Sequence, residues 1–284
     1  MTYKHYIITR FNLRKSEWTI GKNKNPVLTD LWHDNRFELF KNFCFPSVAN
    51  QTNQNFEWLI FFDNNTKPKY RKIIEDLQTQ FSGFSPIFID GMDAFLPSVQ
   101  HIINRCNQPY LITSRLDNDD CLSRHYIEIV QKQFKKQDFL ALDFVNGYTL
   151  QTGKQFKIGK ELHVFNPFIS LIEKNDNPVT VWSRSHASWK HEPLIKNIKN
   201  KPIWLSVIHE ENKVNKFKGY GNLDIQKLLQ DFAIKTDKKA NISKNLMPCN
   251  YWFVENKINY VSSYFNYYFK ILKSNFRFFI KIFL

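Results

Sequence analysis

Three carboxylates within four positions are the most distinctive chemical feature of the chain. Asp117, Asp119 and Asp120 follow the apolar residues 110–113, which are typical of a buried strand. Carboxylates this close together repel one another unless a cation or strong hydrogen-bond donors lie beside them. Mg²⁺ and Mn²⁺ prefer oxygen ligands and often join one or two carboxylates to substrate phosphates. The Asp-x-Asp pattern therefore predicts a site for a divalent cation and a diphosphate, with a solvated acidic turn as the alternative.

The elements expected around this cluster alternate between strands and helices. Apolar runs predict strands at residues 6–9, 58–62, 87–89, 110–113 and 139–145, and apolar side chains at helical spacing predict helices within residues 37–44, 70–81, 95–106 and 126–134. Short strands separated by helices are typical of a mostly parallel α/β sheet. Such sheets bind ligands beyond the carboxyl ends of their strands. Because Arg10, Asp63 and Asp117 each follow a strand, we expect these side chains to meet at one edge.

The second half of the chain has a looser pattern. Residues 148–164 predict a hairpin with Gly153 and Gly159 in its turns. No low-complexity linker interrupts the chain before residue 212. We therefore expect one domain over residues 1–215, followed by a basic, aromatic-rich helical region over residues 216–284.

The composition argues against several kinds of site. With only 8 Gly, the chain has neither G-x-G-x-x-G nor G-x-x-x-x-G-K-[ST], so a glycine-rich loop would not hold a nucleotide. Its 4 Cys include no C-x-x-C pair, which favours reduced thiols over a zinc site or disulfides. The first residues do not resemble a signal peptide, and no apolar stretch reaches the roughly 18 residues of a membrane span. These features favour a cytoplasmic protein.

Several short motifs resemble those of the putative rhamnosyltransferases, a family of GT-A glycosyltransferases. They are T-R-F-N at 9–12, F-P-S-V at 45–48 with Q-T at 51–52, F-E-W at 56–58 before Asp63, R-L-D-N-D-D at 115–120, N-P-F-I-S-L-I-E at 166–173 and V-I-H-E-E-N at 207–212. The similarity runs over roughly residues 5–215. It implies a GT-A-like, Rossmann-like fold in which helices flank a mostly parallel sheet. It also implies transfer of a hexose from a nucleotide-diphosphate sugar to a cell-surface glycan precursor, with dTDP-linked L-rhamnose as one candidate donor.

The resemblance assigns a metal site to this chain. Asp117 and Asp119 would bind Mn²⁺ or Mg²⁺ through the Asp-x-Asp motif, and the cation would offset charge on the leaving nucleoside diphosphate. His209 would be a third protein ligand, since similar enzymes often supply a histidine near the end of the domain. An ordinary, partly buried histidine beside an apolar strand is the alternative for His209.

Donor-binding residues follow from the same resemblance. Asp63 would contact the base or the ribose, and Asp117 would reach the donor through the metal. Arg10 and Arg115 could pair with phosphate oxygens, because a planar guanidinium matches a phosphate. Structural salt bridges to the acidic cluster are the alternative for both arginines.

The catalytic base is open at this point. An inverting transferase needs a carboxylate or an imidazole that accepts the proton of the acceptor hydroxyl. The Glu-Asp pair of many GT-A enzymes is absent between residues 160 and 215, and this absence also leaves inverting or retaining chemistry undecided. The residues that remain are His186, Glu192, Glu210, Glu211 and Asp143, and no spacing rule chooses among them. We take His186 and Glu210 as the catalytic candidates, with a structural role as the alternative for His186.

Positive charge is concentrated toward the C-terminus. Residues 1–150 carry 18 Lys and Arg against 16 Asp and Glu, whereas residues 151–284 carry 22 against 10. On a helical wheel, Asn259, Ser263, Asn266, Lys270, Lys273, Arg277 and Lys281 fall on one face, and Phe265, Tyr268, Leu272, Phe276, Phe279 and Phe283 fall on the opposite one. This pattern predicts a helix in the membrane interface. The predicted location is the inner face of the plasma membrane, with anionic lipid as partner and a glycan or lipid-linked glycan as acceptor. Packing of the aromatic face on the protein's own core is the alternative.

A nucleic-acid-binding protein or a metal-dependent nuclease is the main alternative function. Basic charge interleaved with aromatic residues is typical of single-strand binders. However, the excess charge lies outside the domain with the acidic cluster, and no recognised nucleic-acid motif is present. We therefore expect no nucleic-acid partner.

Overall fold

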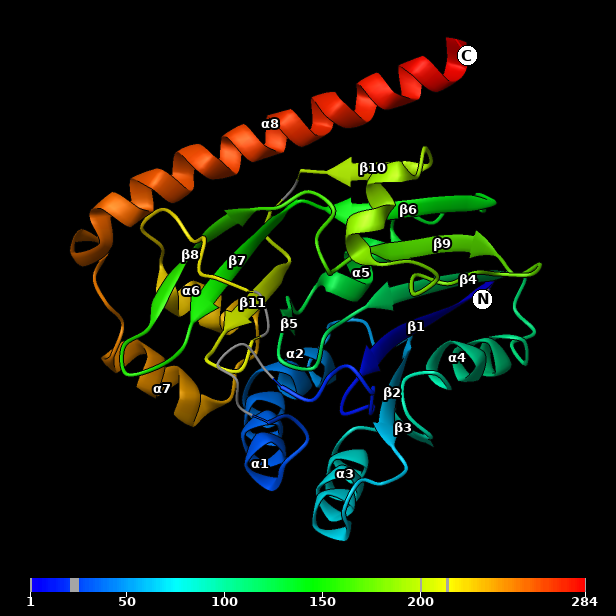
Figure 1. Ribbon diagram of the computed structural model, residues 1–284, viewed down its shortest axis with the longest axis horizontal. Coiled ribbons are helices and arrows are strands. Elements are labelled where there is room, and N and C mark those ends of the chain that lie inside the picture. Colours follow the sequence, from blue (N-terminus) through cyan, green and yellow to red (C-terminus); the bar gives the residue numbers. More distant parts are fainter. Residues whose placement is uncertain (1, 21–25, 200, 213–214, 284) are drawn as a thin grey trace.

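A seven-stranded, mostly parallel sheet forms the centre of the protein (Figure 1). The computed structural model describes residues 2–20, 26–199, 201–212 and 215–283, with side chains up to residue 274. The strand order is β10-β6-β9-β4-β1-β2-β3. The bounds are β1 (Tyr3–Arg10), β2 (Glu57–Asp63), β3 (Phe84–Ile89), β4 (Tyr110–Arg115), β6 (Phe139–Phe144), β9 (Ser170–Lys174) and β10 (Ile195–Ile198). Only β9 runs antiparallel to its neighbours, β4 and β6.

Helices cover this sheet because its strands are apolar on both faces. In β1, Ile7 packs in one buried cluster and Ile8 in another, as expected for side chains that alternate across a strand. The flanking helices are α1 (Asp30–Leu39), η1 (Phe40–Cys44), α2 (Phe45–Ala49), α3 (Pro68–Gln80), α4 (Phe95–Ile103) and α5 (Tyr126–Gln131). The predicted fold class, a mostly parallel α/β sheet flanked by helices with a C-terminal helix, is confirmed.

A smaller sheet lies beside the large one and has the order β5-β11-β7-β8. Its strands are β5 (Cys121–Leu122), β7 (Asn146–Gln151), β8 (Lys157–Leu162) and β11 (Trp204–Ile208). The predicted hairpin is present as β7 and β8. The prediction that Gly159 lies in a turn was wrong, because this residue pairs with Thr149 inside β8. Only glycine fits there, since a Cβ would overlap the backbone of Gly219 and Tyr220.

The chain after residue 215 begins by packing on this smaller sheet. Helices α6 (Ile225–Asp231) and α7 (Thr236–Lys244) contribute Leu228 and Ile242 to an apolar cluster that includes Leu150 of β7 and Val207 of β11. The division at residue 215 stays a prediction, and these contacts place α6 and α7 on the body of the protein.

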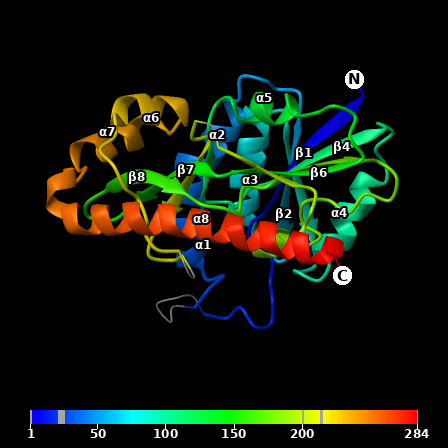
Figure 2. The same ribbon diagram turned by 90° about the horizontal axis from the view of Figure 1, so that it is seen from above.

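The last helix, α8 (Phe253–Phe283), follows η3 (Cys249–Trp252) and runs along one side of the molecule past both sheets (Figures 1 and 2). Ser263 and Ser274 are buried on the side of α8 that faces the body, where Tyr264, Tyr267 and Ile271 pack against an apolar cluster. Among the residues that the structure describes, no helix is long and apolar enough to span a membrane.

Candidate functional site

A cavity of about 380 Å³ opens at the carboxyl edge of the large sheet. Arg10 ends β1 and Arg115 ends β4, and both line this cavity together with the acidic segment after β4. Helix α1 supplies Arg36, and the short 3₁₀ helix η2 (His186–His191) supplies His186. Of the three strand-end residues predicted to meet, Arg10 and Asp117 line this cavity, whereas Asp63 does not.

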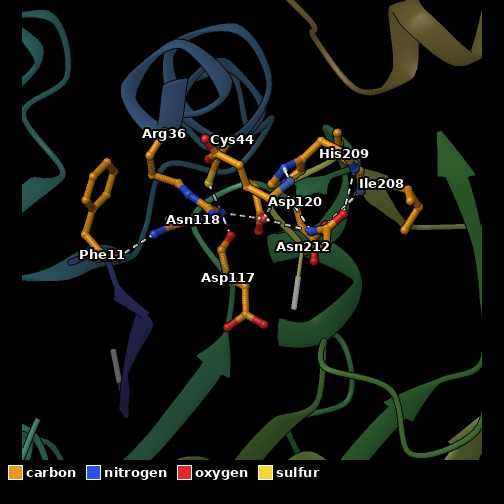
Figure 3. A network of polar contacts seen from close by, with 12 residues as sticks. Phe11, Arg36, Cys44, Asp117, Asn118, Asp120, Ile208, His209 and Asn212 are labelled. Atoms are coloured by element: carbon orange, nitrogen blue, oxygen red, sulfur yellow. Dashed lines mark hydrogen bonds and ion pairs between the residues drawn. The ribbon is translucent and has the colours of Figure 1, made fainter. Parts of the chain in front are cut away.

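Asp119 is the most heavily bonded carboxylate of the site. Its Oδ2 accepts hydrogen bonds from Arg36 Nη1 at 2.6 Å, His209 Nε2 at 2.9 Å and Asn212 Nδ2 at 3.3 Å. Arg36 and His209 approach the acidic segment from opposite sides (Figure 3). Burial raises the pKa of Asp119, but the Arg36 charge and the His209 hydrogen bond outweigh it and hold this pKa below its ordinary value. Asp119 is therefore ionised and fixed in position.

The other two aspartates have different surroundings. Asp120 is buried and accepts the backbone N–H of Val207 at 2.8 Å, which ties the acidic segment to β11. Burial, and then the charges of Asp119 and Asp117, raise the pKa of Asp120. The Asp117 carboxylate is about one third exposed and points away from His209 and Asn212 (Figure 3). Asp120 thus belongs to the fold, whereas Asp117 is partly exposed and forms an ion pair with Arg115, whose Nη2 lies 3.4 Å from its Oδ1.

Two arginines stack on one tryptophan at the edge of this cavity. The guanidinium carbons of Arg10 and Arg115 lie 4.2 Å and 4.1 Å from the ring centre of Trp182. Burial lowers the pKa of Arg10 to about 10, the Asp117 charge opposes this change and the Arg115 charge adds to it. Arg10 is still charged at neutral pH. The planar stacking leaves the guanidinium edges available for an anion.

The sequence reasoning missed Arg36 and Trp182. The sequence does not single out Arg36, because a single arginine in a helix is usually solvated. In the structure, however, this side chain is 8% exposed. Its spacing from the apolar Phe37, Phe40 and Cys44 could have placed it near the buried side of the helix. The Nε atoms of Arg36 and Arg115 are buried and have no hydrogen-bond partner within the described parts of the chain. Buried donors of this kind usually have a partner, so these two point to a bound anion.

Asp63 has a structural partner in this arrangement. Its carboxylate accepts the backbone N–H of Arg14 at 3.0 Å and Arg14 Nε at 2.8 Å, and it is 2% exposed. Asp63 does not line the cavity. These bonds fix the segment that follows β1, and the predicted contact with a base or ribose stays a prediction.

His186 lies at the rim with one ring nitrogen engaged. Its Nδ1 donates to the carbonyl oxygen of Phe165 at 3.0 Å, which leaves the lone pair on Nε2. Burial lowers the pKa of His186, the bond to Phe165 opposes this change, and the Arg115 charge lowers the pKa further. The imidazole is therefore neutral near pH 7 and able to accept a proton.

The carboxylates considered as bases differ in their access to this cavity. Glu210 is exposed and lines two other cavities. Glu211 does line the cavity, and its buried Oε2 has no hydrogen-bond partner among the described residues. Glu192 forms an ion pair with Arg184, and Asp143 accepts hydrogen bonds from Asn166, Asn197 and the Phe165 backbone. Only His186 and Glu211 of the five lie where an acceptor could meet a donor.

The predicted metal ligands fit a cation in part. Asp119 Oδ2 and His209 Nε2 are 2.9 Å apart, about the separation of adjacent ligands on an octahedral cation with bonds near 2.1 Å. However, the Glu211 backbone N–H donates to His209 Nδ1, so the ring proton is on Nε2. Within the described ranges, no three His, Cys, Asp or Glu side chains gather as a metal site. Asp117 is the most exposed of the three carboxylates, and a cation bound there would replace its ion pair with Arg115.

The solved structures that match this chain have low sequence identity to it and TM-scores below 0.5. S. aureus TarS 1–349 in complex with UDP is 11% identical with a TM-score of 0.41, over 72% of this chain and 60% of that one. A putative nucleotide-diphospho-sugar transferase from Desulfovibrio desulfuricans G20 is 10% identical with a TM-score of 0.39, over 87% and 99%. The glycosyltransferase GlyE of Streptococcus pneumoniae TIGR4 is 10% identical with a TM-score of 0.38, over 90% and 64%.

The sequence comparisons are more selective. No curated protein matches the chain significantly. One family model, described as "Putative rhamnosyl transferase", matches residues 6–220. This range contains all the motifs on which the resemblance was based, together with Arg36 and Trp182. Since the match covers well over half of its residues, the chain belongs to the putative rhamnosyl transferase family.

Proposed function

We propose that this protein transfers a hexose from a nucleoside-diphosphate sugar to a cell-surface glycan precursor, with dTDP-linked L-rhamnose as the first donor to test. The observation that carries the proposal is the group of arginines around one cavity. Arg10, Arg36 and Arg115 all line it, and two of them have a buried Nε without a partner among the described residues. Guanidinium groups bind phosphate oxygens through paired N–H donors, so a diphosphate suits this group. Family membership supports the same assignment.

A divalent cation, Mn²⁺ or Mg²⁺, is part of this proposal. Asp117 would hold it with the donor diphosphate, and Asp119 and His209 would join if Arg36 withdraws and the His209 ring proton moves to Nδ1. Such a cation, when bound, offsets charge on the leaving diphosphate. Arg10 and Arg115 add positive charge on the Trp182 side of the same cavity.

The affinity for a nucleoside diphosphate should depend on this cation. We expect dTDP or UDP to bind more tightly with Mn²⁺, and Asp117→Asn to abolish the difference because the amide is a poor cation ligand. Calorimetry with and without Mn²⁺ measures both. Asp90→Asn is the matched control, since Asp90 is an exposed carboxylate outside the cavity. Metal-independent binding that is the same in Asp117→Asn would contradict a role for the cation.

We assign the base to His186, with Glu211 as the competing group. Both line the donor cavity, but His186 is held by the Phe165 carbonyl with Nε2 able to accept a proton. The acceptor hydroxyl would lose its proton to Nε2 as it attacks the anomeric carbon, and the nucleoside diphosphate would leave. A glycosyltransferase that uses one base in a single displacement inverts the configuration of that carbon.

We further propose that α8 attaches the enzyme to an anionic membrane. In the aromatic face predicted from the sequence, Phe265, Tyr268 and Leu272 are 67%, 55% and 67% exposed, and Phe276, Phe279 and Phe283 lie outside the described side chains. Val261 and Phe269 extend this face and are 65% and 52% exposed. Of the predicted polar face, Ser263 is buried against the body, whereas Asn266 and Lys273 are exposed. An apolar helical face of this size is typical of an interaction surface. Lys257 and Lys273 lie on either side of it and can reach lipid phosphates.

Binding to vesicles tests this attachment. Replacing Phe265, Phe269 and Leu272 together with serine should abolish co-sedimentation with phosphatidylglycerol vesicles, because it removes most of the apolar area available to the lipid. Leu31→Ser is the control, since Leu31 is 70% exposed on α1. Equal pelleting of the triple variant and the unaltered protein would contradict membrane attachment through α8, and so would no pelleting of either.

A further inference from the structure

A second cavity, of about 440 Å³, lies between α8 and the segments around His163 and His186. Helix α8 supplies Lys270 and Lys273, and η2 supplies Lys190. We call this the lysine cavity. His186 lines both the lysine cavity and the donor cavity. A molecule bound in the lysine cavity can therefore extend a group to the proposed base.

The lysine cavity has an excess of positive charge. Lys190, Lys270 and Lys273 take part in none of the ion pairs found in the described part of the chain, whereas lysines elsewhere do. Burial lowers the pKa of Lys270, and the nearby Lys218 charge lowers it further. Ammonium groups that lie close together repel one another, and a bound anion removes this cost.

The nearest acidic groups, Asp143 and Glu161, neutralise this charge only in part. Burial raises the pKa of Glu161 to about 7, with Lys218 and Lys270 opposing, so this carboxyl is only partly ionised at neutral pH. Asp143 is enclosed by its own amide donors. Lys270 Nζ donates to the Val164 carbonyl at a long 3.4 Å, which leaves its other two N–H groups free for a ligand.

The position of the cavity indicates where its anion comes from. Phe269 lines the lysine cavity and also belongs to the exposed aromatic face of α8. A lipid embedded along that face would have its headgroup at the cavity entrance. A volume of about 440 Å³ lies within the range of small-molecule sites and suits phosphate groups with an attached sugar.

We propose that the lysine cavity binds the phosphate groups of a lipid-linked acceptor, whose sugar extends past His186 into the donor cavity and whose hydrocarbon chain leaves along the aromatic face of α8. The inference rests on the proposed function, because it needs a donor on the other side of His186. It adds a site for the acceptor, and it gives the exposed face of α8 a role in placing that acceptor.

A short-chain prenyl diphosphate is a soluble probe for this site. Calorimetry of the full chain with farnesyl diphosphate, in the presence of saturating dTDP or UDP, measures binding outside the donor cavity. Replacing Lys190, Lys270 and Lys273 together with glutamine should weaken binding by about 10- to 100-fold, since charged hydrogen bonds to phosphate are lost. The matched control replaces Lys72, Lys227 and Lys244, which are exposed lysines outside the cavity and away from α8, and should stay within about twofold.

A second variant, which changes no charge, tests the proposal even if the triple lysine variant does not fold. Ala187 is exposed at the mouth of the lysine cavity, so Ala187→Trp should fill the cavity without altering charge or the core. It should also weaken farnesyl diphosphate binding. Unchanged binding in both the triple lysine variant and Ala187→Trp would overturn the proposal.

Two further measurements distinguish failure of the lipid assignment from failure of the proposed function. If inorganic pyrophosphate binds the lysine cavity as tightly as farnesyl diphosphate does, the occupant is a free phosphate and the lipid assignment is overturned. Binding of dTDP and UDP to the same proteins reports on the donor cavity alone. If the unaltered chain binds neither nucleotide but the lysine variants lose farnesyl diphosphate, the proposed function fails while the anion site stands.

Discussion

Replacing His186 with alanine should lower kcat for sugar transfer by about 100- to 10,000-fold, the range typical of a positioned general base. The physical reason is the fixed tautomer: Nδ1 donates to the Phe165 carbonyl, and the pKa, lowered by burial, keeps Nε2 unprotonated near pH 7. The KM for the donor should change little, because the phosphates contact arginines instead. Initial rates at saturating donor measure the effect.

Two variants make this result specific. His101→Ala removes an exposed histidine at the end of α4 and should leave the rate unchanged. Glu211→Gln removes the competing carboxylate, whose buried Oε2 has no partner among the described residues. Full activity in His186→Ala together with a large loss in Glu211→Gln would show that Glu211 is the base.

Asp119→Asn should lower the transfer rate by about 100- to 1,000-fold, as when one charge contact to a transition state is lost. Asp119 carries the ion pair that holds Arg36 at 2.6 Å and the hydrogen bond from His209. Without this carboxylate, the buried Arg36 charge has no counterion and Arg36 leaves its place at the cavity. The variant should also melt at a lower temperature, since an unpaired buried charge is destabilising.

The Asp120→Asn variant distinguishes the loss of transfer rate from the loss of stability. Asp120 is also buried in the same segment, at 3% exposed against 8% for Asp119, but it accepts a hydrogen bond from the Val207 backbone and belongs to the fold. We expect Asp120→Asn to lower the melting temperature with a much smaller change in rate. If both variants lose rate and stability in the same proportion, Asp119 has only a structural role.

The sequence was sufficient for five of the seven strands of the central sheet, because these are short, apolar runs separated by helical patterns. Each predicted strand in residues 6–145 is present, and Arg10 and Asp117 meet at the carboxyl edge as the strand-end argument required, whereas Asp63 does not line the cavity. The antiparallel insertion of β9 between β4 and β6 was not predictable, since strand order depends on contacts far apart in sequence. The place of Gly159 inside a strand was not predictable either, because the close approach of the backbone of Gly219 and Tyr220, far along the chain, leaves room only for glycine.

The site was predicted only in part, because some of its residues are brought together by contacts between distant parts of the chain. Carboxylates after a strand are visible as a pattern, so Asp117 and Asp119 were found. Arg36 is 83 positions from Asp119 and has no pattern that links it to the acidic segment. Trp182 became important only because β1 and β4 place two arginines against its ring. The orientation of α8 also needed the structure, since a helical wheel gives two faces but not which one meets the body.

The central claim is that the arginine-lined cavity binds a nucleoside-diphosphate sugar for transfer. The most direct test is release of nucleoside diphosphate from a panel of nucleotide sugars, led by dTDP-L-rhamnose, with and without Mn²⁺ and with the Asp119→Asn variant in parallel. The account predicts release from at least one donor, enhanced by Mn²⁺ and reduced at least about 100-fold in Asp119→Asn. Absence of release from every donor, together with tight binding or cleavage of single-stranded nucleic acid, would contradict it.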